Sequence, residues 1–339
     1  MGAVVKTKAM IVIARRAALL GVLMGFAAFA AAAAEDPAKY PTQPIRMIVP
    51  FAPGGASDFT ARLIEPGMSA FLGRRVIIEN RPGAAGNIGM ELAALAPPNG
   101  YTAFLANIGV AAINPAMFPD LKVKPDKDFI GVTLVVITPG VLIAHPSFPP
   151  NSVKELVDYV RARPGKVNFA SPGSGSLYRL EMEQLRLEAG LDMMHIPYKG
   201  GAGPAVTEVV AGHVEMMMVT VSSAIGHIRS GRLKALAVST AERLAVLPEV
   251  PTLAEQGFPK NVSSQWQALM VPAATPRPIV DKLRAAIAHA LSDQSVRDRM
   301  TAAGQIPTTS ASPEEFKAFL AAETAKWAEV VKAVGAQPE

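Results

Sequence analysis

Short apolar runs alternate with helix-type patterns along most of this chain. The runs at residues 45–49 and 167–170 are mainly apolar and bounded by turn residues, which is typical of strands. The segments that follow them, 59–72 and 177–187, carry apolar residues at helical spacing. Strands separated by helices of this length favour parallel sheets with right-handed crossover connections. The alternation therefore predicts an α/β fold class.

The same two patterns predict further elements. Strands are expected at 76–78, 101–106, 194–196, 214–219 and 233–238, and helices at 88–95, 204–211 and 223–228. Two capping boxes, Ser152 with Glu155 and Ser312 with Glu315, predict that a helix begins directly after each serine. The second of these helices has an apolar face that we expect to pack on a domain, formed by Phe316, Leu320, Trp327, Val331 and Val334.

The first 34 residues have the organisation of a secretory signal peptide. Four basic residues precede an apolar stretch at 17–26, and small residues at 30–34 supply an A-x-A cleavage pattern. We expect cleavage near Ala34 and an exported protein that diffuses in a bacterial periplasm, since no cysteine is present for a lipid anchor. A retained membrane anchor is the weaker alternative, because the apolar run is short for a bilayer span.

The charge outside this segment is nearly balanced. The chain has 33 Lys and Arg against 28 Asp and Glu, a formal net charge of +5, and four of the basic residues precede the first acid. The remainder carries 29 basic residues (33 − 4) against 28 acidic ones, a difference of +1. A near-neutral body gives no basic footprint for nucleic acid, so we expect no nucleic-acid partner.

Sequence signatures of catalysis and of cofactor binding are missing. There is no cysteine, which excludes disulfides, thiolate metal sites and cysteine nucleophiles. The five histidines are scattered without HExxH spacing, and neither a G-x-S-x-G elbow nor a GxxxxGK[ST] loop occurs. The glycines at 83–89 have the wrong spacing for a dinucleotide turn. We therefore expect no metal, no cofactor and no catalytic residues.

Three Gly-rich loops, at 50–58, 171–176 and 198–204, each join a predicted strand to a predicted helix. Glycines let the backbone turn tightly and bring N–H groups close to a ligand. A helix start adds unpaired N–H donors and a partial positive charge, which together hold an anion such as a carboxylate. Ordinary βα turns favour the same residue types, so a single loop is weak evidence, whereas three loops predict a carboxylate site.

Several motifs follow one another in fixed order over about residues 40–335. They are YPTQPIR at 40–46, VPFAPGGASD at 49–58, ENRPGAAGNIG at 79–89, NGYT at 99–102, AINP at 112–115, PYKG at 197–200, LAVS at 236–239 and PEVPT at 248–252. Together they closely resemble the Bug family, the substrate-binding proteins of tripartite tricarboxylate transporters.

The resemblance implies a type II periplasmic binding protein, in which two lobes close on a ligand cleft like a flytrap. It implies a division into the signal peptide at 1–34, the N-terminal part of lobe 1 at 35–139, lobe 2 at 140–259 and a C-terminal return to lobe 1 at 260–339. The chain would cross between the lobes near Pro139 and again near residues 250–262.

The resemblance also implies where the ligand binds. One carboxylate is held by the first loop and by ordered waters that bridge to the second lobe. Carried over by motif, the ligand-binding residues are Phe51, Pro53, Gly54, Gly55, Ala56, Ser57, Asp58 and Asn107, facing Ser171, Gly173, Ser174, Gly175, Ser176, Tyr198, Lys199 and Gly200.

This chain departs from the family pattern at positions that bear on specificity, which we expect at Arg179, Val219 and Thr220. Arg179 stands where the family often has His, and it either meets a second ligand carboxylate or is a solvated helix residue. The family often has Asp after the strand at 214–219, where this chain has VTVSS, which argues against an α-amino group on the ligand. An apolar wall at Val219 and Val221 would accept an aromatic or aliphatic body. Ala111 likewise replaces a frequent His.

These observations favour a periplasmic solute-binding protein that captures a small organic acid, with a di- or aromatic carboxylate favoured over an amino acid. It would be a monomer that serves either membrane transporter subunits or a periplasmic sensor domain. One alternative is a secreted α/β hydrolase that uses Ser174 or Ser176, and another is an interaction module without a small ligand.

Overall fold

A computed structural model describes residues 37–173, 176–198 and 202–336. The predicted signal peptide lies outside the described residues. All helices and strands named below belong to one compact unit, Pro41–Glu339. Within the described ranges, no helix is both long enough and apolar enough to cross a membrane.

One part of the sheet is built on β1 (Ile45–Val49), which the apolar run predicted. Its strands are β1, β2 (Val76–Asn80), β3 (Thr102–Asn107), β4 (Phe129–Ala144), β9 (Ser264–Pro272) and β10 (Ile306–Pro307). β1 pairs in parallel with β2 and β3. β9 lies between β3 and β4 and is antiparallel to both, and β10 is antiparallel to β4.

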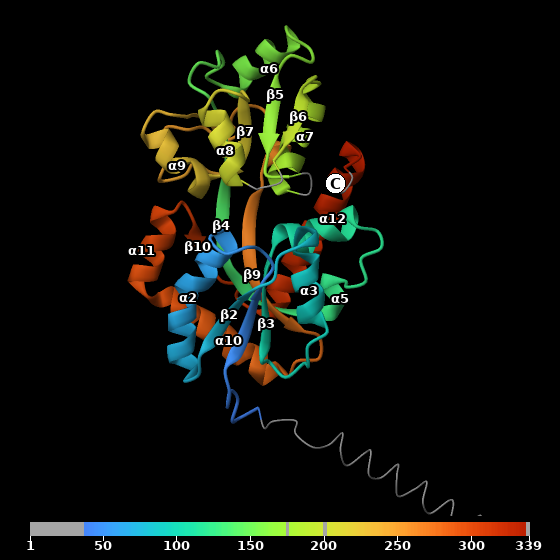
Figure 1. Cartoon of the computed structure of the whole chain (residues 1–339), viewed down its shortest axis with the longest axis vertical. Helices are drawn as coiled ribbons and strands as arrows, with labels where there is room; N and C mark the ends of the chain where they lie inside the picture. The colour runs from blue at the N-terminus through green and yellow to red at the C-terminus, as the bar shows by residue number, and fades with distance from the viewer. Residues whose placement is uncertain (1–36, 174–175, 199–201, 337–339) are drawn as a thin grey trace, which may run out of the picture. The chain divides into compact units, whose positions relative to one another are not determined.

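The other part of the sheet is built on the second half of β4. Its further strands are β5 (Asn168–Ser171), β6 (Met194–Pro197), β7 (Met216–Thr220) and β8 (Lys234–Val238). β5 pairs in parallel with β6 and β7, whereas β7 and β8 are antiparallel to β4. Pro139 pairs with β9 and Gly140 pairs with β7, so β4 changes partners between these two residues. Figure 1 shows β4 and β9 running side by side.

The sheet is mixed and not parallel throughout, which corrects the expectation of parallel sheets, while the α/β class is confirmed. Each parallel pair joins two strands that the apolar runs predicted. The antiparallel pairs all involve β4 or β9, which the patterns did not identify as strands. Both are almost entirely buried. A strand that is buried on both faces is a continuous apolar run without the alternation that marks a half-exposed strand.

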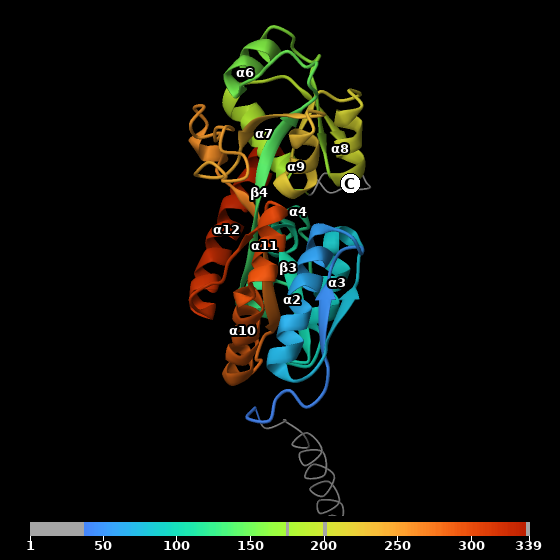
Figure 2. The same cartoon turned by 90° about the vertical axis from the view of Figure 1, so that its left-hand side faces the viewer.

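Helices cover the strands on both sides. They are α2 (Ala56–Leu72), α3 (Asn87–Ala94), α4 (Asn114–Met117), α5 (Pro125–Asp128), α6 (Val153–Arg161), α7 (Leu177–Ala189), α8 (Ala202–Val210), α9 (Val221–Arg229), α10 (Arg277–Ser292), α11 (Gln294–Ala302) and α12 (Pro313–Val334), with short helical turns η1 (Ala84–Gly86), η2 (Gly109–Ile113) and η3 (Pro259–Asn261). α2 and α12 lie on opposite sides of the strands in Figures 1 and 2.

Both predicted capping boxes are present. The Ser152 hydroxyl accepts from the N–H of Glu155, and the Ser312 hydroxyl accepts from the N–H of Glu315, each at 3.1 Å. In each box the glutamate accepts in return from the N–H of the residue before the serine. The helix starts at Val153 and Pro313 are therefore set by local sequence, as predicted.

The apolar face of α12 packs as the helical spacing predicted. Phe316 and Trp327 are fully buried in the main core, and Phe316 meets Trp266 of β9 edge-to-face, with ring centroids 6.0 Å apart. The indole N–H of Trp266 donates to the carboxylate of Glu323 at 2.9 Å. Trp266 therefore points to the α12 side of the sheet.

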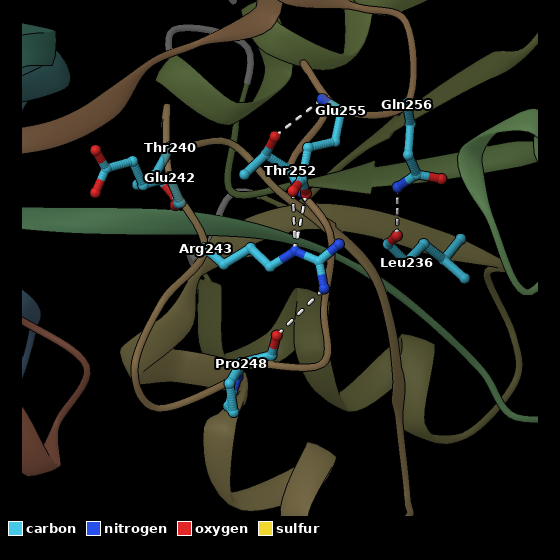
Figure 3. A network of polar contacts seen from close by, with 8 residues as sticks. All are labelled: Leu236, Thr240, Glu242, Arg243, Pro248, Thr252, Glu255 and Gln256. Atoms are coloured by element: carbon cyan, nitrogen blue, oxygen red, sulfur yellow. Dashed lines mark hydrogen bonds and ion pairs between the residues drawn. The ribbon is translucent and has the colours of Figure 1, made fainter.

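The segment between β8 and η3 has no long helix or strand and is held by polar contacts, which Figure 3 shows. The Arg243 guanidinium donates to both carboxylate oxygens of Glu255 at 3.0 Å. Thr252 and Glu255 also bond reciprocally through their side chains and backbone N–H groups. Gln256 donates to the carbonyl of Leu236 at 2.9 Å, which ties the segment to β8.

Candidate functional site

The first Gly-rich loop is organised by Asp58. Its carboxylate accepts from the N–H of Gly54 and from Arg62, each at 2.9 Å, and from the side-chain amide of Asn80 at 3.1 Å. Burial alone would raise the pKa of Asp58, but the hydrogen bonds from Arg62, Gly54 and Asn80 lower it. Asp58 is 3% exposed and ionised, and its hydrogen bonds hold the loop in its conformation.

The start of α2 is open to an anion. Gly55 is its N-cap, and no side chain caps the helix in the described part of the chain. The N–H groups of the first turn, at Ala56 and Ser57, thus have no side-chain acceptor, and the helix dipole places partial positive charge beside them. The N–H of Gly54 is already bound to Asp58, so its contribution is a backbone turn with φ of +85°.

A pocket of about 280 Å³ lies at this helix start. Residues from three distant segments line it, namely Gly54, Gly55, Ala56 and Phe59 from the start of α2, Ser222 and Ser223 from α9, and Ala303 and Gln305 from the turn between α11 and β10. The structure therefore brings three predicted residues, Gly54, Gly55 and Ala56, together with five that sequence analysis missed. None of the described lining residues is charged.

The start of α9 faces the same pocket. Its N-cap Thr220 makes no side-chain bond to a backbone N–H, and its hydroxyl instead lies 2.7 Å from that of Ser223. Two helix starts, α2 and α9, therefore open on one pocket with hydroxyls beside them. Such an arrangement of neutral dipoles suits a small carboxylate.

The described serines of the second Gly-rich loop form hydrogen bonds to other groups of the protein. Ser171 is fully buried, with its hydroxyl 2.6 Å from Nε2 of His195 and 3.2 Å from the N–H of Gly173. The Ser176 hydroxyl caps α7 by accepting from the N–H of Arg179 at 3.2 Å. Four predicted site residues, Ser174, Gly175, Lys199 and Gly200, lie outside the described residues.

Four other predicted residues are not among those that line the pocket. The side chain of Asn107 accepts from the N–H of Val110, in η2, at 3.0 Å. Arg179 lies 3.9 Å from Glu183, with its side chain 15% exposed. Val219 is fully buried in a core cluster, against which the half-buried Tyr198 packs. Burial, and then the charge of Glu208, raises the pKa of Tyr198.

The remaining residues predicted on the first loop frame the helix start. The carbonyl of Phe51 accepts from Asn80 at 3.0 Å, which links the loop to β2. Pro53 is exposed, and Ser57 is buried in the first turn of α2. Among the described residues, no group of three or more His, Asp and Glu side chains could hold a metal ion.

The five pocket residues that sequence analysis missed differ in whether the local sequence could have indicated them. Ser222 and Ser223 directly follow a strand that ends at Thr220, the same strand-to-helix position that pointed to the Gly-rich loops, but without glycine. Phe59 is a turn of helix from Gly55 and could have been included. Ala303 and Gln305 carry no local signal, because only the return of the chain brings them here.

Comparison with known proteins gives a family. Residues 60–336 match the tripartite tricarboxylate transporter family receptor, TctC. Protein BugT of Bordetella pertussis is 36% identical over 324 residues, which cover 95% of this chain and 98% of BugT.

Solved structures of similar proteins support the same family. Periplasmic binding protein BugD has a TM-score of 0.78 at 34% identity, covering 88% of this chain and 100% of BugD. MatC of Rhodopseudomonas palustris with bound malate has a TM-score of 0.77 at 34% identity, covering 86% and 100%. Rpa4515 of R. palustris with adipate has a TM-score of 0.80 at 30% identity, covering 89% and 100%. This chain therefore belongs to the TctC family of tripartite tricarboxylate transporter receptors, the periplasmic solute-binding proteins that the sequence motifs resemble.

Proposed function

We propose that this protein captures a small organic carboxylate between the starts of α2 and α9, for delivery to membrane transporter subunits or to a periplasmic sensor. The observation that carries the proposal is the pocket lined by two helix starts and two serine hydroxyls, with no charged side chain among the described lining residues. Backbone N–H groups at helix starts hold carboxylates well.

The size and polarity of the pocket support a compact diacid or aromatic acid. A volume of about 280 Å³ is close to the lower end of the range for small-molecule sites. No acidic side chain among the described lining residues offers a partner to an ammonium group, which disfavours an amino acid. MatC with malate and Rpa4515 with adipate, both about one third identical to this chain, hold dicarboxylates. Contact of Arg179 with a second carboxylate stays a prediction.

The two-lobe division is part of the same proposal. The change of β4 partners between Pro139 and Gly140 coincides with the boundary that the resemblance implies. The start of β9 at Ser264 lies just after the second expected crossing, at residues 250–262. The strands β4 and β9 would then connect the lobes and act as the hinge on which the cleft closes.

The hydrolase alternative gains no support from the described residues. Ser176 is engaged as the cap of α7, and the serine that does lie beside a histidine, Ser171, is not among the residues that line the pocket. The family assignment likewise points to binding.

Isothermal titration with a panel of organic acids and their matched amides tests the proposal. We expect at least one diacid or aromatic acid to bind with a Kd on the order of 1 μM, which corresponds to about 8 kcal/mol. The matched amide should bind at least about 100-fold more weakly, because each hydrogen bond to a charged group contributes about 1.5–3 kcal/mol. Absence of binding by every acid, with protein shown to be folded and ligand-free, would contradict the proposal.

A further inference from the structure

A row of polar side chains crosses the sheet on the face opposite to α12. Asn107 of β3 pairs with Gln267 of β9, and Gln265 of β9 pairs with Thr138 of β4. Residues directly opposite one another on neighbouring strands share a face, as do residues two apart along a strand. Trp266 lies between the two glutamines and points to α12, so the glutamines point away from it.

Gln305 extends this row. Ile306 pairs with Ile137, and the N–H of Thr308 donates to the carbonyl of Val135 at 3.2 Å. Continuing this antiparallel register by one residue places Gln305 opposite Thr138. Thr138 and Gln267 are 0% exposed and Gln305 is 2% exposed, so these three side chains are shielded from bulk solvent, whereas Gln265 is half-buried.

Several polar atoms of the row have no hydrogen-bond partner among the described residues. They are the hydroxyl oxygen of Thr138, both amide atoms of Gln267 and Oε1 of Gln305. Buried polar atoms without a partner are rare in folded proteins, because each has lost its hydrogen bonds to water. A concentration of them on one sheet face indicates that water or a bound molecule completes their hydrogen bonds.

Gln305 is the member of the row that also lines the pocket. Its amide donates to the hydroxyl of Thr60 at 3.3 Å, one helical turn beyond Ala56 on α2. The preceding Gly304 has φ of +70°, and a side chain there would stand 2.7 Å from Cγ1 of Val221 and 3.4 Å from the backbone N of Ser222. Gln305 is thus fixed between the starts of α2 and α9, with one polar atom of its amide still unpartnered.

We propose that Gln305 is a specificity-determining residue, whose Oε1 accepts a hydrogen bond from a hydroxyl that the ligand carries close to its carboxylate. The inference rests on the proposed function and narrows its substrate class to hydroxy acids. Oε1 is an acceptor and needs a donor, which an ionised carboxylate lacks and a hydroxyl supplies. An ammonium donor would also serve, but the described pocket offers no acid to balance its charge. Thr138 and Gln267 behind Gln305 then hold ordered water.

Titration with pairs of acids that differ by one hydroxyl tests this. The pairs are malate and succinate, 2-hydroxyglutarate and glutarate, and mandelate and phenylacetate. In any pair that binds, we expect the hydroxy acid to bind about 10-fold more tightly, since one hydrogen bond of ordinary strength gives a difference of that order. Gln305→Met, which keeps the length of the side chain and removes its amide, should abolish the difference by weakening the hydroxy acid more than the plain acid.

The matched control is Gln294→Met, the same chemical change on the exposed surface of α11, which should keep the preference of the wild type. Equal affinity within every binding pair of the wild type would overturn the inference, as would a preference that persists in Gln305→Met. Equal weakening of both members in Gln305→Met would also overturn it, because it would show a purely structural role. In all three cases the acids still bind, so the proposed function stands. Binding by none of the six acids overturns the inference, while the wider acid panel decides the proposed function.

Discussion

Two buried carboxylates show how surroundings decide what a residue does. Asp58 has three hydrogen-bond donors, and its pKa is lowered despite burial. Glu181 on α7 is 1% exposed, and both of its oxygens lack a hydrogen-bond partner among the described residues. Burial raises the pKa of Glu181 to about 8, and the nearby charges of Lys326, which lowers it, and Glu323, which raises it, do not reverse the shift. Asp58 is therefore ionised at neutral pH and Glu181 is protonated.

Glu181→Gln should remove a pH dependence of stability. The folded chain keeps a proton on Glu181 that the unfolded chain releases near pH 4.5, its ordinary pKa. The free energy of unfolding should thus fall as pH rises from about 4.5 to about 8, by at most about 1.4 kcal/mol per pH unit, and level off above that. Urea unfolding at pH 5–9 measures this slope for wild type and variant.

Glu329→Gln, on the exposed surface of α12, is the control and should keep the wild-type profile. A profile for Glu181→Gln that runs parallel to the wild type at every pH would show that Glu181 is ionised in the folded protein.

At the scale of elements, sequence analysis predicted correctly the helices and strands whose ends are set by neighbouring residues. β1 begins and ends where its apolar run does, and the capping boxes place the starts of α6 and α12 to the residue. α2 begins three residues before the predicted Phe59, because its glycine N-cap carries no capping side chain to mark it. β4 and β9 were missed because a fully buried strand has no alternation, and only partners distant in sequence define it.

The two ends of α2 offer a matched pair of substitutions. Gly54 and Gly73 have φ of +85° and +66°, and an added side chain would meet nothing within 4 Å at either position. Valine at positive φ is strained by roughly 1–2 kcal/mol, so Gly54→Val and Gly73→Val should each lower the free energy of unfolding by about that amount. Only Gly54 lines the pocket, so only Gly54→Val should abolish carboxylate binding.

Chemical denaturation and titration of both variants check this pair. Loss of affinity to the same extent in Gly54→Val and Gly73→Val would mean that strain in α2, and not the pocket, accounts for it.

For the whole molecule, the candidate site is assembled from segments that the chain brings together over long distances. The motifs located the loop at 54–56, because glycines between a strand and a helix are a local signal. The family resemblance, confirmed by 36% identity with BugT, gave the fold and the class of function. Gln305 was beyond sequence reasoning, because β10 must pair with β4 before Gln305 reaches α2. The assembly of the candidate site therefore depends on strand pairing as well as on the local motifs.

A crystal structure with a bound carboxylate tests the central claim most directly, using the acid that titration identifies as the tightest. The account predicts a carboxylate oxygen within about 3.2 Å of the backbone N of Ala56 or Ser57, with the other end of the ligand toward Ser222 and Ser223. A ligand carboxylate held elsewhere, with the first turn of α2 facing only solvent, would contradict it.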